Sequence, residues 1–99
     1  MNEAMACGLP AVVSAAAGSC RDLVDDGRTG FRFESGDCVA LADALMKMER
    51  ALASSASAMR SSVASKTARY SCDRAVEGVL EALECLPSMD RPMTARLAV

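Results

Sequence analysis

The chain has no histidine and no tryptophan, and its aromatic residues are one tyrosine and two phenylalanines among 99 residues. Without histidine it lacks the commonest general base at neutral pH and the usual partner of a nucleophilic serine or cysteine. The apolar fraction is 52%. Because much of it is alanine, which loses little surface on burial, we expect a modest hydrophobic core. The sequence therefore gives no support for a hydrolase with a catalytic triad.

Charge of one sign is not concentrated anywhere, and the net charge is -2. No basic stripe accompanies stacking aromatic residues, so we expect no nucleic-acid partner. No run approaches the roughly 20 apolar residues of a membrane span, and the first residues lack the pattern of a signal peptide. These features predict a chain without a transmembrane segment, located in the cytoplasm.

The five cysteines are spaced widely and irregularly, with no Cys-x-x-Cys pair, at Cys7, Cys20, Cys38, Cys72 and Cys85. An odd number in this arrangement argues against a disulfide framework and against a zinc site, which would also have to do without histidine. We expect free cysteines that behave as small hydrophobic residues in a reducing compartment, and no bound metal.

Residues 3–14, EAMACGLPAVVS, are the most informative segment. A short helical stretch with an acidic residue at its start, Glu3, reaches Gly8, a typical helix terminator. Pro10 then prevents the helix from continuing, and residues 10–14 form an apolar, β-branched run. This pattern predicts the end of a helix followed by a strand of a parallel sheet with both faces covered.

A second strand is predicted at residues 31–33, after a short helix over residues 19–25. Between them lies a turn, residues 26–30, with two glycines that can each adopt a positive φ. Because a helix connects the two strands, we expect them to pair in parallel.

The rest of the chain is predicted to be helical. Asp37 is a suitable N-cap for a helix that reaches about Leu52. Leu41, Leu45 and Met48, together with Leu52, recur at helical spacing and are expected to face the core.

An Ala/Ser-rich link over residues 54–57 is predicted to separate this helix from a second one over residues 58–69. Met59 and Val63 are expected to point inward from the second helix, with Thr67 as a further candidate.

Ser71 is a suitable cap for a third helix, and Pro87 ends it. This helix carries an amphipathic stripe of Val76, Val79, Leu80 and Leu83. Residues 87–99 have no sustained period and are predicted to be a mobile tail.

The order and spacing of these segments resemble the carboxyl-terminal domain of retaining GT-B glycosyltransferases of family four. The first match is residues 3–14, which resemble a Glu-Ala-Met-Ala-Cys-Gly-x-Pro stretch of that family. Four further matches follow in order: residues 13–24, 25–33, 35–45 and 68–71. The resemblance covers roughly residues 2–84 and implies an incomplete Rossmann-like α/β fold: two short parallel strands followed by three helices.

The resemblance also implies a site. The family has two glutamates seven residues apart, the first near the donor sugar and the second near the ribose hydroxyls. Glu3 corresponds to the second, and the first would lie ahead of Met1. A carboxylate suits this role because it can accept hydrogen bonds from two vicinal hydroxyls. The family loop often carries paired glycines or an acid where this chain has residues 15–17, so we assign no binding residue there, and no catalytic residue anywhere.

The resemblance implies a UDP-, GDP- or ADP-type sugar donor for the parent enzyme, with no metal and no other cofactor. In the family, the terminal helices cross towards the other domain, and the parent could lie peripherally at the inner membrane face. We divide the chain into residues 1–86, a partial nucleotide-sugar-binding domain, and the tail over residues 87–99.

Two functions remain open. The chain is interpreted as the carboxyl-terminal fragment of a nucleotide-sugar-dependent retaining glycosyltransferase, inactive alone, so that its status as an enzyme is left undecided. The alternative is a non-catalytic interaction module that docks on a partner supplying the missing sheet. In either case we expect the isolated chain to self-associate, because two short strands leave an apolar sheet edge exposed.

Overall fold

The computed structural model describes residues 1–87. Its elements are α1 (Asn2–Ala6), β1 (Ala11–Ser14), α2 (Cys20–Leu23), β2 (Gly30–Phe33), α3 (Cys38–Thr67), the 3₁₀ helix η1 (Ala68–Tyr70) and α4 (Cys72–Glu84). Two short strands followed by helices make this a small mixed α/β unit, as the sequence predicts. The predicted tail lies, apart from its first residue, outside the described residues.

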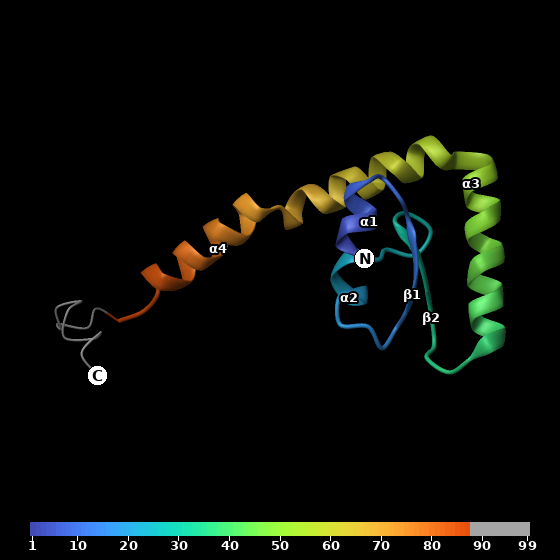
Figure 1. Ribbon diagram of the computed structural model, residues 1–99, viewed down its shortest axis with the longest axis horizontal. Coiled ribbons are helices and arrows are strands. Elements are labelled where there is room, and N and C mark those ends of the chain that lie inside the picture. Colours follow the sequence, from blue (N-terminus) through green and yellow to red (C-terminus); the bar gives the residue numbers. More distant parts are fainter. Residues whose placement is uncertain (88–99) are drawn as a thin grey trace.

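The sheet consists of β1 and β2, which pair in parallel with Ala11 opposite Gly30 and Ser14 opposite Phe33. The predicted parallel pairing is therefore confirmed. In Figure 1, α1 and α2 lie on one side of the two strands and the first half of α3 lies on the other. The second half of α3 passes over the amino ends of the strands.

The turn between α2 and β2 uses its two glycines for different purposes. Gly27 has a positive φ of 81°, as the turn requires. Gly30 does not, because it already belongs to β2. A Cβ atom at Gly30 would overlap the carbonyl oxygen of Ala11 on the neighbouring strand. Of the two glycines able to take a positive φ, Gly27 alone does so, and at Gly30 glycine is required for close approach of the backbones.

The predicted link between the first two long helices is a kink inside α3. Ser55 is the one residue of α3 with non-helical torsion angles, φ −150° and ψ 39°. Its hydroxyl donates to the carbonyl of Ala51 at 3.1 Å, and the hydroxyl of Ser54 donates to the carbonyl of Arg50 at 3.0 Å. Such bonds to the preceding turn bend helices. The chain therefore changes direction at one serine instead of over residues 54–57.

Both predicted helix caps are present. The Asp37 carboxylate accepts a hydrogen bond from the amide of Ala40 at 2.9 Å, where α3 begins. The Ser71 hydroxyl accepts one from the amide of Arg74 at 3.2 Å, where α4 begins. Each bond satisfies a backbone donor that the first turn of a helix leaves unpaired.

The core is small and is built around Met5, Leu23 and Val63, with Met1 packed against them. Met59 and Val63 are buried, as predicted for the second half of α3. In the first half of α3, the buried side chains are Ala44 and Met48, and the leucines of the predicted set are not among them. Leu45 and Leu52 are exposed, which corrects the prediction for these two side chains.

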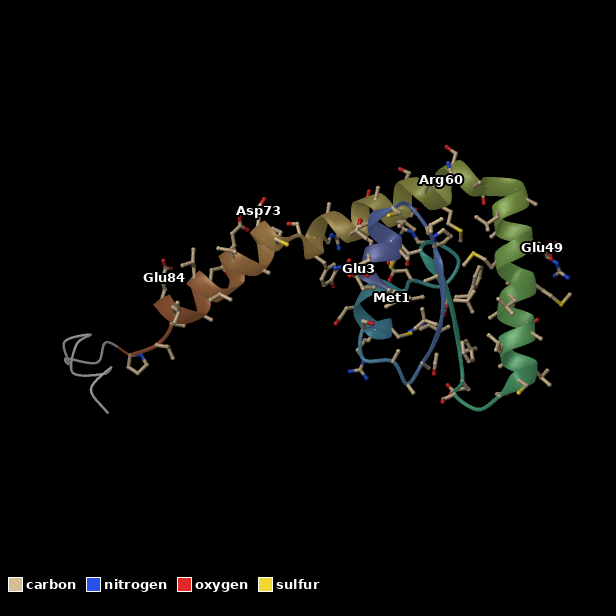
Figure 2. The ribbon with its side chains drawn as sticks, in the orientation of Figure 1. Met1, Glu3, Glu49, Arg60, Asp73 and Glu84 are labelled. Atoms are coloured by element: carbon tan, nitrogen blue, oxygen red, sulfur yellow. The ribbon has the colours of Figure 1, made fainter. Side chains whose placement is uncertain are left out.

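Helix α4 does not cover the sheet (Figure 1). It projects from the end of α3 (Figure 1), and Asp73 and Glu84 at its two ends lie away from the α/β body (Figure 2). Its four stripe residues are each 55–60% exposed. The radius of gyration is 19.4 Å, against about 13 Å for a compact domain of this length. The apolar face of α4 therefore has no partner within residues 1–87.

The contact at Gly30 can be tested by Gly30→Ala. The added methyl group would push β2 away from Ala11, so we expect a loss of about 1–3 kcal/mol in the free energy of unfolding. Gly18→Ala is the matched control, because Gly18 has no positive φ and nothing within 4 Å of the position of a Cβ atom. Urea unfolding followed by circular dichroism measures both. Equal unfolding midpoints for the two variants would argue against the close approach.

Candidate functional site

Glu3 lies in the first turn of α1, whose position is set by the way the helix ends. The amide of Gly8 donates to the carbonyl of Met5 at 2.9 Å, and the amide of Leu9 donates to the carbonyl of Ala4 at 3.2 Å. With Gly8 at φ 82°, this is a Schellman motif. The motif reverses the chain into β1, while Met5 anchors α1 in the core.

The side chain of Glu3 is exposed, and Figure 2 shows it at the beginning of α1. No hydrogen bond or ion pair joins its carboxylate to another group within residues 1–87. Because Met5 is buried and Glu3 is not, α1 presents its acid to solvent. The position of Glu3 in the first turn favours the helix, and no group within residues 1–87 pairs with the carboxylate, which is thus available to a ligand.

The loop after β1 is closed by its own backbone. The Ser14 hydroxyl accepts from the amide of Ala16 at 3.2 Å, and the carbonyl of Ser14 accepts from the amide of Ala17 at 3.0 Å. Ser19 stands at the N-cap position of α2 without a side-chain capping bond. These hydrogen bonds account for the conformation of the loop without a ligand. No binding residue was predicted in it from the sequence.

The turn between α2 and β2 is held by two side chains that the sequence analysis did not single out. The buried hydroxyl of Thr29 donates to the carbonyl of Leu23 and accepts from the amide of Asp25, each at 2.8 Å. The Asp26 carboxylate accepts from the amide of Arg32 and from its guanidinium, at 2.8–3.2 Å. Both Asp26 and Thr29 lie in the turn over residues 26–30 that the sequence predicts, and this shared location could have drawn attention to them.

The Asp26–Arg32 pair shifts both ionisations. Hydrogen bonds from the Arg32 guanidinium lower the pKa of Asp26 below its ordinary value of 3.8, although partial burial opposes the shift. The same contact raises the pKa of Arg32. Both side chains are about half exposed, so solvent screens the pair and its contribution to stability is small.

A hollow of about 710 Å³ lies between β2 and the first half of α3. Its charged groups largely neutralise one another, because Arg32 pairs with Asp26 at 2.9 Å and Lys47 pairs with Asp43 at 3.0 Å. Glu3 does not line it. The predicted binding residue and this hollow therefore belong to different parts of the described structure.

Within residues 1–87, no three histidine, cysteine, aspartate or glutamate side chains come together in a way that could hold a metal ion. The four exposed cysteines and buried Cys20 are all free thiols. None of the helices over the same residues is long and apolar enough to span a membrane.

The parallel strands, the crossover through α2 and the flanking helices define a piece of a Rossmann-like α/β protein. A family model described as "Glycosyl transferases group 1" matches residues 1–50, half of the chain. The chain belongs to this family. No curated protein and no solved structure matches it.

The Asp26–Arg32 pair predicts a pH dependence. Since the pKa of Asp26 is lowered by folding, its stabilising effect is complete above pH 3.8 and is lost as the pH falls through the lower, folded-state value. The melting temperature of Asp26→Asn should therefore lie slightly below that of the wild type at pH 6, and the gap should close in more acidic buffer. Thermal melts across this range measure the gap. A gap that stays constant down to acid unfolding would contradict the assignment.

Proposed function

We propose that this chain supplies the ribose-binding part of the donor site of a retaining, nucleotide-sugar-dependent glycosyltransferase, with Glu3 as the ribose ligand. The observation that carries the proposal is the membership of residues 1–50 in the family of group 1 glycosyltransferases, a segment that includes Glu3. The family membership supports a nucleotide-sugar donor in general terms, and the sugar and base are not specified by it.

The state of Glu3 supports this role. Its carboxylate is exposed and has no partner within residues 1–87, so ligand binding would not require an existing ion pair to break. The two oxygens of a carboxylate accept hydrogen bonds from two neighbouring hydroxyls, and such charge-assisted bonds are the stronger ones. Vicinal ribose hydroxyls present this arrangement of donors.

One such contact is too weak to hold a donor alone. A hydrogen bond to a charged group contributes about 1.5–3 kcal/mol, whereas even millimolar affinity needs about 4 kcal/mol. We therefore propose that residues 1–86 act as part of a larger donor domain, that they have no transferase activity alone, and that residues outside these 99 complete the site.

This proposal predicts that nucleotide sugars bind weakly, close to α1. In NMR titrations of the chain with UDP-, GDP- and ADP-sugars, we expect shifts around α1 with a dissociation constant weaker than about 1 mM. Glu3→Ala should abolish them, and the corresponding 2′-deoxyribose compounds should bind less. Glu49→Ala, which removes an exposed acid from α3, should leave the shifts unchanged (Figure 2). Shifts that persist in Glu3→Ala, or no shifts with any donor, would count against Glu3 as a ribose ligand.

A second candidate function, an interaction module, is favoured by the exposed face of α4. Four aliphatic side chains, each more than half exposed, form a stripe along one helix. In addition, β1 pairs with only one strand within the described part of the chain, so its other edge has unpaired backbone groups there. Either surface would favour association with another protein or with a second copy of the chain.

The contribution of α4 can be tested by Val79→Glu combined with Leu83→Glu. Glutamates at two of the four stripe positions should prevent burial of the stripe. The double variant should therefore sediment as a monomer at concentrations where the wild type forms oligomers. Ala82→Glu, which adds a charge outside the stripe, is the control and should associate like the wild type. Oligomers of unchanged size in the double variant would assign association to the edge of β1 instead.

A further inference from the structure

A second hollow, of about 330 Å³, lies between the turn that precedes β2 and the second half of α3. Every side chain that lines it is polar: Asp25, Arg28, Thr29, Ser61, Ser62, Ser65, Lys66 and Arg69. A hollow without any apolar side chain does not suit a hydrophobic ligand, which needs apolar surface to be buried against it. We therefore call it the polar hollow and consider which polar ligand it fits.

The polar hollow is positively charged. Three cations, Arg28, Lys66 and Arg69, face a single carboxylate, Asp25, which leaves a net charge of plus two. Asp25 pairs with Lys66 at 3.1 Å, across the gap between the turn and α3. Arg28 and Arg69 have no ion-pair partner within residues 1–87. Two guanidinium groups are thus free to bind an anion.

Three hydroxyls add neutral donors to these cations. Ser61, Ser62 and Ser65 lie on the face of α3 that borders the hollow, and their hydroxyls bond to no other group of the described chain. Two other serines of the same helix, Ser54 and Ser55, bond to carbonyls of the preceding turn. The hydroxyls of these three serines are therefore available to a ligand.

The wall that carries Arg28 is rigid. Thr29, which is 1% exposed, ties the turn to Leu23 and Asp25, and the Asp26–Arg32 pair fixes the other side of the same turn. The Asp25–Lys66 pair then fixes the turn against α3, with Lys66 only 16% exposed. The backbone of the turn that carries Arg28 is thus held in place before a ligand binds, which lowers the entropic cost of binding.

We propose that the polar hollow binds a phosphate group, either free, as a small phosphate ester, or as the headgroup of an anionic lipid. A phosphate carries close to two negative charges at neutral pH and several strong acceptor oxygens. Guanidinium groups match its geometry with paired hydrogen bonds, and hydroxyls can satisfy the remaining oxygens. The volume leaves room for the phosphate and part of the molecule attached to it.

The site lies at the amino ends of β1 and β2, over which the second half of α3 passes (Figure 1). The strands finish at the opposite edge, at Ser14 and Phe33. The proposal goes beyond the donor-binding role and does not depend on Glu3.

The test uses the 99-residue chain and inorganic phosphate as the probe, with sodium chloride at the same ionic strength as the reference. Binding to the folded state should raise the melting temperature and shift NMR signals of the Asp25–Thr29 turn. Arg28→Ala combined with Arg69→Ala should weaken binding about tenfold or more, since each arginine makes charge-assisted bonds. Arg50→Ala, which removes an exposed arginine of α3 outside the hollow, should have no effect.

Vesicles distinguish the two sources of phosphate. One set contains phosphatidylcholine alone and the other contains phosphatidylcholine with phosphatidic acid at four to one. Co-sedimentation with the second set only, competed by inorganic phosphate and lost in the double variant, assigns a headgroup. Binding of free phosphate without co-sedimentation assigns a small phosphate compound. The proposal is overturned if neither probe binds, or if binding of either is as strong in the double variant as in Arg50→Ala.

Discussion

The parallel contact between Ala11 of β1 and Gly30 of β2 is the constraint on which the described structure depends. It is possible only because Gly30 has no side chain, since a Cβ atom there would overlap the Ala11 carbonyl. Just before it, Thr29 ties the turn to α2 through its buried hydroxyl. Because β2 leads directly into α3, this contact also fixes where the long helix starts. The sheet, the turn and α3 are thus positioned together.

A sheet of two four-residue strands cannot enclose a core, and the helices supply most of it. Met5 from α1, Leu23 from α2 and Val63 from α3 meet beside the strands, although they are far apart in the sequence. The kink at Ser55 makes this possible, because it turns the second half of α3 across the strands towards α1. Helix α4 has no comparable contact, and its aliphatic stripe is exposed. Residues 1–87 therefore form an α/β body and a helix, α4, whose apolar face is not covered by any of them.

Two surfaces of this body have different chemistry. Glu3 offers an exposed carboxylate, suited to hydroxyl donors, and it is the residue through which we connect the chain to nucleotide-sugar binding. The polar hollow offers three serine hydroxyls and two arginines that pair with no acid within residues 1–87, suited to an anion. Glu3 could be singled out from the sequence because the segment around it follows a family pattern. The polar hollow could not, because Arg28 and Arg69 are 41 residues apart and no local pattern connects them.

The sequence by itself determined those features that depend on neighbours within a few residues. Gly8 ends α1, and Asp37 and Ser71 cap their helices, because each of these involves bonds across one turn. The apolar run before Ser14 forms a strand because its β-branched residues favour extended backbone. Tertiary structure alone decided which residues of the first half of α3 are buried beside Met48 and which distant groups meet. It buried Ala44 in place of Leu45, it required a glycine at residue 30 for contact with β1, and it joined Asp25 to Lys66. These outcomes depend on how elements pack in space, which a one-dimensional pattern does not specify.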